Sequence, residues 1–335
     1  MSASHRVAGS AKHNRPQATF STPKMAILAV ALLLAGVVVC DVTMETKILF
    51  RTSEFPARTN ESEVSTDFND LKVINESTCS PSTVNRSEIQ YRSEHRYYAT
   101  VEGMTPLPAP VFRDNHVTLC NKSDRSDLAF EYCLPISGRK DASFCAGADR
   151  MDLLTHHSKL TRCYASVLHM LLVEVYEELQ VFGKHPIVVF GSLLGAVRNG
   201  SMIPFTEDTD IAYSGELNAD DDLGRALVSK GYHFFFFDIW RVCVAPTHPL
   251  ATLLYDPTLP ITGNFAVPYL DLYATEKLND TAWRMTGFDD TLPTNKVEPF
   301  SQVTINGLPF DTVHDPNYFL IEMYGDHYMS PKPRE

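Results

Sequence analysis

Positive charge is scarce in this sequence. Its 335 residues include 29 Lys and Arg against 41 Asp and Glu, which gives a net charge of -12 at pH 7. An acidic surface repels phosphate backbones, so we do not expect nucleic acid as a partner, and a phosphate-bearing substrate has to be met through metal ions. Helical heptads and internal repeats are also lacking, so the pattern indicates no particular oligomer.

The cysteines lack the paired C-x-x-C spacing of a zinc site. Cys40 lies in an apolar segment, and the remaining six form an even set: Cys79, Cys120, Cys133, Cys145, Cys163 and Cys243. An even set of this kind makes disulfides plausible in an oxidising compartment. Six cysteines allow fifteen connectivities, so the sequence alone assigns none.

The first 24 residues contain no acidic residue, and residues 25–40 contain no charge at all. Such an apolar run spans about 24 Å as a helix, less than the roughly 30 Å core of a bilayer, so it needs flanking residues or a thin membrane. We expect a cytosolic basic tail over 1–24 and a transmembrane signal anchor over 25–43, with the rest luminal by the positive-inside rule. A cleaved signal peptide is the alternative, although no A-x-A site follows the run.

A luminal body is also supported by six N-glycosylation sequons, at Asn60, Asn75, Asn85, Asn121, Asn199 and Asn279. Roughly two would be expected by chance. We expect glycans at all of them except Asn199, which lies inside the motif described below, where a glycan could obstruct a substrate cleft. Together with the anchor, these features predict a single-pass type II protein of the Golgi or endoplasmic reticulum membrane.

Residues 44–110 are rich in Ser, Thr, Asn and Glu and end in the proline-rich stretch TPLPAP. This composition buries too little apolar surface to offset chain entropy, which predicts a disordered, glycosylated stem. Residues 111–150 hold three cysteines and little periodicity, and we interpret them as a Cys-containing lead-in. The ordered domain is expected over 151–335.

Within 151–335 helical and strand patterns alternate, which predicts an α+β fold. Apolar residues recur at helical spacing from Leu160 to Leu179, and Gly183 supplies a stop. The acid run after Asn218 is interpreted as a helix start, because capping side chains and carboxylates satisfy free N–H groups and the helix dipole. The remaining expected elements are a strand over 187–190, a helix over 193–198, a strand over 208–213, a strand or half-hairpin over 233–244 and a strand over 269–273.

Asp208 and Asp210 stand one residue apart on the strand expected over 208–213, so both side chains point to the same face of the sheet. Two converging carboxylates are unfavourable without a cation, whereas Mg²⁺ or Mn²⁺ binds through carboxylate oxygens together with substrate phosphates. A lone pair at this spacing also arises on solvated sheet edges. The surrounding order therefore decides the interpretation.

Two neighbouring features favour a metal site. Upstream, a strand runs into Gly191 and Ser192 and then a helix, where glycine lets the backbone approach a phosphate and the helix N-terminus presents N–H groups. Downstream, Asp271 stands mid-strand in an otherwise apolar run, as a third carboxylate would. This layout resembles the active sites of nucleotidyltransferases of the DNA polymerase β type, in which carboxylates hold two metal ions.

Residues 190–211, FGSLLGAVRNGSMIPFTEDTDI, resemble the signature of the LicD, fukutin and fukutin-related protein family. The resemblance continues at 269–273 (YLDLY) and 316–325 (PNYFLIEMYG), so it covers the whole ordered half of the chain. Two positions depart from the family pattern: Phe205 replaces a tryptophan, and Thr206 replaces the first acidic residue. The lost acid bears on how tightly one metal is held.

The resemblance implies a nucleotidyltransferase-type mixed sheet with flanking helices. It also implies transfer of a phosphate-containing group, such as ribitol phosphate or phosphocholine, from a CDP-linked donor to a glycan or glycoprotein. Carried over by position, it implies a catalytic and Mg²⁺- or Mn²⁺-binding role for Asp208, Asp210 and Asp271. Gly191 and Ser192 would contact the donor phosphate, and Arg198 would stabilise phosphate charge or brace the loop.

Several alternatives stay open. Arg241, a cation on an otherwise apolar strand, is expected either to reach a phosphate or to form a buried salt bridge with one of the acids. A D-x-D nucleotide-sugar glycosyltransferase is a second enzyme class, against which Asp271 and the Gly-Ser loop argue. A catalytically inactive LicD-like glycan-binding or scaffold protein is a third possibility, which the retained carboxylates disfavour.

Overall fold

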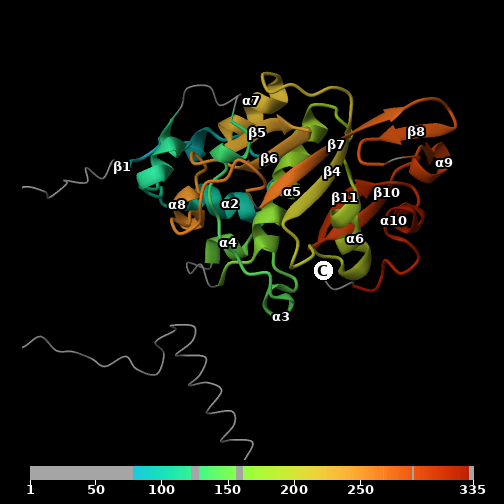
Figure 1. The fold of residues 1–335 in the computed structure, drawn as a ribbon, viewed down its shortest axis with the longest axis horizontal. Coiled ribbons are helices and arrows are strands. Elements are labelled where there is room, and N and C mark those ends of the chain that lie inside the picture. The colour runs from blue at the N-terminus through green and yellow to red at the C-terminus, as the bar shows by residue number, and fades with distance from the viewer. Residues whose placement is uncertain (1–77, 122–127, 156–160, 267, 289, 332–335) are drawn as a thin grey trace, which may run out of the picture. The chain divides into compact units, whose positions relative to one another are not determined.

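The computed structural model describes residues 78–121, 128–155, 161–266, 268–288 and 290–331, which are coloured in Figure 1. All of them belong to one compact unit, Val73–Glu335. The expected basic tail over 1–24, the expected anchor over 25–43 and the sequons at Asn60 and Asn75 lie outside the described residues. No helix among the described residues is long and apolar enough to cross a membrane.

The centre of the fold is a mixed sheet. Its strands are β3 (Ile187–Val188), β4 (Asp208–Ser214), β5 (Tyr232–Phe237), β6 (Ile239–Val244), β7 (Tyr269–Lys277), β8 (Ala282–Met285) and β9 (Leu292–Pro293). The order along the sheet is β3-β4-β7-β6-β5, and β8 and β9 continue from β7. Strands β4 and β7 pair in parallel, which sets Asp210 directly opposite Asp271.

Helix α5 (Tyr164–Val181) covers one face of this sheet, and almost all of its side chains are buried. Leu168 and Leu171 pack in one cluster with Leu270 and Leu272 of β7. Because successive side chains of a strand point to opposite faces, Asp271 lies on the face away from α5. The helix predicted from the apolar spacing is therefore confirmed, and it packs against the face of the sheet opposite to the candidate site.

The other face of β4 carries α6 (Phe190–Asn199), which also contacts α10 (Pro316–Tyr324) and β10 (Ser301–Ile305). Phe190 and Leu193 of α6 share a buried cluster with Ala212 of β4 and Phe319 of α10. In Figure 1 these C-terminal elements, drawn in red, gather beside α6. Strand β11 (Leu308–Thr312) pairs with β10 as a hairpin and lies next to β3.

The interval 233–244, expected as one strand or half of a hairpin, forms a complete hairpin of β5 and β6. Asp238 makes the turn with a φ of +63°. The acid run after Asn218 begins α7 (Asp222–Ser229), as expected, and the Asp221 side chain accepts the Gly224 N–H at 2.7 Å. This cap gives the acid run a structural role, because it satisfies a free N–H of the first turn.

The stem expected over 44–110 is wrong for residues 78–110. These residues form β1 (Thr78–Cys79), the 3-10 turn η1 (Arg86–Glu88) and α2 (Arg96–Gly103). Tyr97, Tyr98 and Val101 of α2 are buried in the same cluster as α5. The composition of the long polar window concealed a short helix whose three large apolar side chains all face the core.

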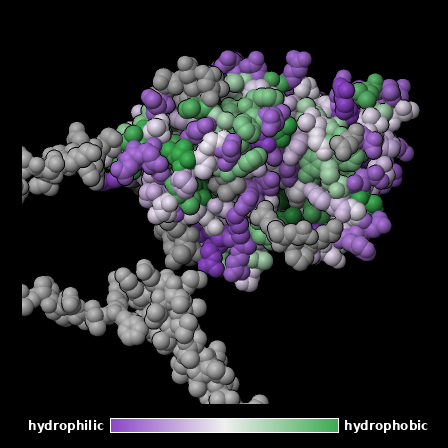
Figure 2. Space-filling view, in the orientation of Figure 1, coloured by the Kyte–Doolittle hydropathy of each residue, from purple (hydrophilic) through white to green (hydrophobic). Residues whose placement is uncertain are grey.

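Short elements complete the described chain. They are β2 (Phe112–Arg113), η2 (Asp114–Cys120), η4 (Phe130–Tyr132), α3 (Ala142–Cys145), α4 (Asp152–Thr155), α8 (Ala251–Leu254) and α9 (Thr294–Val297). On the face shown in Figure 2, hydrophilic residues in purple cover much of the outline, and hydrophobic residues in green form smaller patches between them.

Three disulfides join the six cysteines other than Cys40, as expected from their even number. The pairs are Cys79–Cys120, Cys133–Cys243 and Cys145–Cys163. The second pair links the segment after η4 to β6, and the third links α3 to the residue that precedes α5. The Cys-containing segment before α5 is thereby fastened to the sheet and its supporting helix.

Candidate active site

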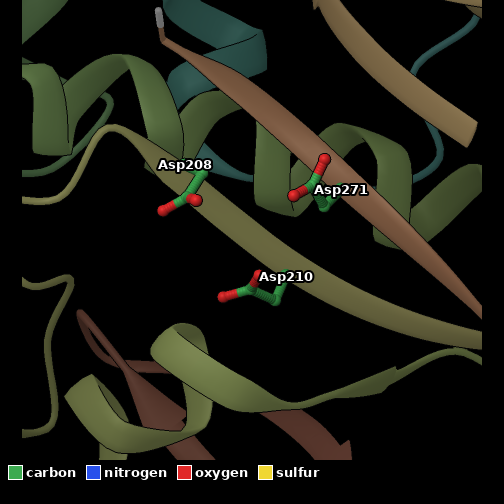
Figure 3. Close-up of side chains that lie close together, drawn as sticks. All are labelled: Asp208, Asp210 and Asp271. Carbon is green, nitrogen blue, oxygen red and sulfur yellow. The ribbon is translucent and has the colours of Figure 1, made fainter. Parts of the chain in front are cut away.

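Asp208, Asp210 and Asp271 converge in the structure. Figure 3 shows the first two on β4 and the third on the neighbouring β7, with all three side chains close together. One carboxylate oxygen from each lies within 4.8 Å of the others. Asp210 and Asp271 are each only 5% exposed, whereas Asp208 is more accessible to solvent. The three residues singled out from the sequence thus form one cluster with an open side.

Burial and mutual repulsion oppose negative charge in this cluster. Burial, and then the charges of Asp208 and Asp271, raise the pKa of Asp210 well above its usual range. Burial also raises the pKa of Asp271 to about 6, although the neighbouring Arg241 opposes the shift. A divalent cation would remove this conflict, and an all-oxygen donor set is the one that Mg²⁺ or Mn²⁺ prefers. The residues present therefore fit the expected metal.

The first turn of α6 holds Asp210 in place. The Ser192 N–H donates to Asp210 Oδ2 at 3.2 Å, and the Asp210 N–H donates to Ser192 Oγ at 2.7 Å. A Cβ at Gly191 would lie 3.0 Å from Asp210 Oδ2, so the glycine permits this close approach. Gly191 and Ser192, expected to contact a donor phosphate, here position a carboxylate that belongs to the site.

Arg198 lies near the C-terminal end of α6 and binds the segment after α10. Its Nε donates to the carbonyl of Tyr328 at 2.8 Å, and its Nη2 contacts that carbonyl and the carbonyl of Ser330. Arg198 was expected to stabilise phosphate charge or to brace the loop at Gly191 and Ser192, and its hydrogen bonds go instead to the segment after α10. The guanidinium holds the C-terminal segment against α6.

Arg241 forms a buried salt bridge with Asp271. Its Nε lies 2.7 Å from Asp271 Oδ1, and both side chains are less than a tenth exposed. The guanidinium also donates to the carbonyl of Phe237. Its Cζ lies 5.6–5.8 Å from the ring centroids of Phe130, Phe237, Phe265 and Tyr269. Of the two expected roles, the ion pair is the one present, and it compensates one of the three negative charges.

Comparison with known families bears directly on this cluster. Residues 187–312 match the model of the family described as LicD/FKTN/FKRP, nucleotidyltransferase domain. The matched region contains all three aspartates together with α6. This match supports a LicD-type nucleotidyltransferase domain over residues 187–312. No curated protein is significantly similar to the chain in sequence.

A LicD domain suggests a transferase of the phosphotransferase type that modifies glycans or cell walls. Members of the LicD family are metal-dependent in general, which agrees with the carboxylate cluster. The resemblance inferred from residues 190–211 is thereby confirmed. The matched region also includes Thr206 and Phe205, the two positions at which this LicD domain departs from the family pattern.

Thr206 serves the LicD site through its hydroxyl. Its Oγ1 donates to Asp208 Oδ1 at 2.8 Å. The adjacent Glu207 is paired with Lys140 and is not part of the cluster found for Asp208 and its two neighbours. At this position the chain therefore has a hydrogen-bond donor that orients Asp208.

Tyr273 is a site residue for which no role was expected from the sequence. Its hydroxyl lies 3.4 Å from Asp210 Oδ1 and 3.3 Å from Asp271 Oδ2, so it can donate to either carboxylate. A signal was present in the sequence, because Tyr273 follows Asp271 by two residues and therefore shares its face of β7. The same alternation that predicts the Asp208 and Asp210 pair predicts this contact.

The sequon asparagines within the described residues are Asn85, Asn121, Asn199 and Asn279, and all four are exposed. Asn199 is the last residue of α6, whose first turn faces Asp210. About 13 Å of helix separates the two ends of α6. A glycan on Asn199 would therefore be attached at the end of α6 far from the carboxylate cluster. Its place in the motif alone does not make it an obstruction to that cluster.

Proposed function

We propose that this LicD domain transfers a phosphate-containing group, such as ribitol phosphate or phosphocholine, from a CDP-linked donor to a glycan or glycoprotein. The observation that carries the proposal is the convergence of three carboxylates, two of them buried, against the first turn of α6. Asp208, Asp210 and Asp271 would hold Mg²⁺ or Mn²⁺. When bound, the metal would neutralise the donor diphosphate and stabilise the charge that develops during transfer.

The chain's own residues contribute preorganisation. Each carboxylate is oriented by a different neighbour: Thr206 contacts Asp208, Ser192 contacts Asp210, and Arg241 contacts Asp271. Groups that are already oriented cost little to rearrange when the substrate reacts. A rigid set of carboxylates therefore favours one position for the donor diphosphate.

The transfer has a simple bond balance. A hydroxyl oxygen of the acceptor forms a bond to the phosphorus of the transferred group, and the bond from that phosphorus to CMP breaks. The hydroxyl proton is released, and CMP leaves. Because the reaction involves no change of oxidation state, it requires no redox cofactor, and catalysis rests on positioning and charge stabilisation.

We place this reaction in the secretory pathway, with the domain in the lumen of the Golgi or endoplasmic reticulum and the membrane contact made by the segment 25–43. The three disulfides support an oxidising compartment. The exposed sequons are compatible with N-glycosylation there. The acidic net charge argues against nucleic acid as a partner.

A catalytically inactive glycan-binding or scaffold protein is the second candidate, and one observation favours it. Arg241 compensates Asp271, and Thr206 replaces an acid of the family pattern, so the cluster carries less negative charge than the pattern would provide. A weaker metal site could leave binding without transfer. The convergence of three carboxylate oxygens favours the enzyme.

The full-length protein, purified in mild detergent, provides the test. CMP release is measured from CDP-ribitol and CDP-choline with Mn²⁺ and a mixture of microsomal glycoproteins as acceptor. We expect CMP release that EDTA stops and that falls by at least about a hundredfold in Asp208→Asn. The matched control Asp280→Asn, a change at an exposed position, should retain activity.

Each contrary outcome points to a different account. An Asp208→Asn variant as active as the unaltered protein would overturn the assignment of the carboxylates. Release of UDP from UDP-sugars, with none of CMP from CDP-linked donors, would favour the glycosyltransferase. Metal binding without turnover of any donor would favour the inactive protein.

A further inference from the structure

A cavity of about 440 Å³ lies between α5 and the β10–β11 hairpin. Its lining includes Tyr176 and Gln180 of α5, Phe310 of β11, and Arg150, which precedes α4. Because α5 covers the face of the sheet opposite to Asp271, this cavity is separate from the carboxylate cluster. The family pattern and the proposed reaction leave it without a role.

Arg150 is an unusual residue to line a cavity, because it is charged and buried, and no described residue accepts a hydrogen bond from its guanidinium. Its side chain is 1% exposed, and within the described part of the chain none of its guanidinium nitrogens has a hydrogen-bond partner. Its Cζ lies 5.0 Å and 4.7 Å from the ring centroids of Tyr97 and Tyr98. These cation–π contacts stabilise the charge but occupy no N–H donor. A permanently charged group with unsatisfied donors is costly to bury, and an anion in the cavity would offset that cost.

His95 provides a further donor beside Arg150. Its Nδ1 accepts the Tyr97 N–H at 3.2 Å, so the neutral ring carries its proton on Nε2. Burial, followed by the positive charge of Arg150, lowers the pKa of His95. The ring therefore lines the cavity as a neutral hydrogen-bonding group, and Arg150 supplies the positive charge.

Two carboxylates on the lining restrict the charge of a ligand. Glu177 accepts hydrogen bonds from the hydroxyls of Tyr98 and Ser93, each at 2.8 Å. Asp311 accepts one from Gln302 Nε2 at 3.0 Å. These carboxylates repel any negative charge, so an oxyanion is favoured only in contact with Arg150, but their remaining lone pairs can accept hydrogen bonds from ligand hydroxyls. The lining thus suits one oxyanion attached to a polyhydroxylated body.

We propose that this cavity binds an acidic sugar whose carboxylate or phosphate group draws the buried Arg150 guanidinium into contact, with its hydroxyls on Glu177 and Asp311. The apolar wall formed by Phe310 and Val173 would contact the C–H face of the sugar ring. The volume lies within the range of small-molecule sites, about 300–1,000 Å³. The site does not depend on the transfer reaction, and it would let the domain hold a glycan at a second point.

The test is calorimetric titration of the full-length protein in mild detergent and EDTA. Sodium glucuronate and glucose 6-phosphate represent the carboxylated and phosphorylated sources, glucose is the uncharged control, and inorganic phosphate is the anion without a sugar. We expect at least one acidic sugar to bind about tenfold or more tightly than glucose. Glucuronate should bind more tightly than glucose 6-phosphate, because it carries a single negative charge.

Two results of these titrations would overturn the proposal. If inorganic phosphate binds as tightly as either acidic sugar, the cavity recognises an anion and not a sugar. Absence of saturable binding of both acidic sugars would remove the site altogether.

Variants separate this cavity from the carboxylate cluster. Gln180 is exposed at the cavity rim, so Gln180→Trp should block the entrance and weaken acidic-sugar binding about tenfold or more, whereas Gln90→Trp, at an exposed position that does not line the cavity, should not. Arg150→Met should also abolish binding. If Arg150→Met does not fold, Gln180→Trp provides the test. Asp208→Asn should bind the sugar normally, so failure of the transfer proposal leaves this one testable. Undiminished binding in Gln180→Trp would contradict the assignment.

Discussion

Replacement of Asp210 by Asn should stabilise the metal-free protein and abolish its response to divalent metal. The oxygens of the three carboxylates lie within 4.8 Å of one another. At an effective dielectric constant of about 20, two unit charges at that separation repel each other by about 3.5 kcal/mol. Partial protonation reduces this repulsion. We therefore expect Asp210→Asn to increase the free energy of unfolding by about 2–3 kcal/mol in EDTA at pH 7.5.

The substitution leaves no buried polar group without a partner. The Asn carbonyl can accept the Ser192 N–H that Asp210 accepts now. The Asn amide can donate to the Tyr273 hydroxyl, which then donates to Asp271 Oδ2. Size and hydrogen bonding are thus retained, so the change in stability reports the removal of one negative charge.

Thermal unfolding followed by circular dichroism, in EDTA and in Mn²⁺, is the assay. A gain of 2–3 kcal/mol corresponds to a rise of about 5–10 °C in Tm for a domain of this size. Mn²⁺ at a hundred times its Kd should stabilise the unaltered protein by about 2.7 kcal/mol and the variant not at all. The exposed control Asp280→Asn should change neither value. A loss of more than about 1 kcal/mol in EDTA would refute the reasoning, because it would make the Asp210 carboxylate a structural acceptor.

Three further predictions concern charge. Mn²⁺ should bind more tightly as pH rises through about 6, because Asp271 has a pKa of about 6 and must lose its proton; equal Kd values at pH 5 and 7.5 would contradict this. Arg241→Gln should lower the free energy of unfolding in urea by about 3 kcal/mol, because Asp271 loses its buried partner; a change below about 0.5 kcal/mol would show that the pair is dispensable. Burial lowers the pKa of His169 and His248 to about 3. Both histidines bind protons more readily in the unfolded chain, so the free energy of unfolding should fall as pH drops below 6.5, by about 2 kcal/mol for each at pH 5. Identical urea midpoints at pH 7 and pH 5 would contradict this.

The carboxylate cluster could be predicted because each of its signals is local. Side-chain alternation on one strand sets Asp208 and Asp210 on the same face, and an isolated acid in an apolar run marks Asp271. Their meeting depends on the parallel pairing of β4 with β7, which no local pattern specifies. The resemblance to the LicD signature supplied that long-range information.

Other features depended on contacts between distant segments. Arg241 had two plausible partners in the sequence, and only the register of β6 against β7 sets it opposite Asp271. Tyr97 and Tyr98 were hidden in a polar window, since three apolar side chains suffice when the rest of the body covers them. The cavity beside Arg150 needs α5 and the β10–β11 hairpin to be assembled, so no single motif predicts it.

Calorimetric titration of the full-length protein with CDP-ribitol and CDP-choline, each with Mn²⁺ and with EDTA, tests the central claim most directly. The account predicts that at least one donor binds with Mn²⁺, and that EDTA or Asp208→Asn abolishes binding, whereas Asp280→Asn does not. Donor binding of equal strength in EDTA or in Asp208→Asn would contradict the claim that these three carboxylates bind the donor through a metal.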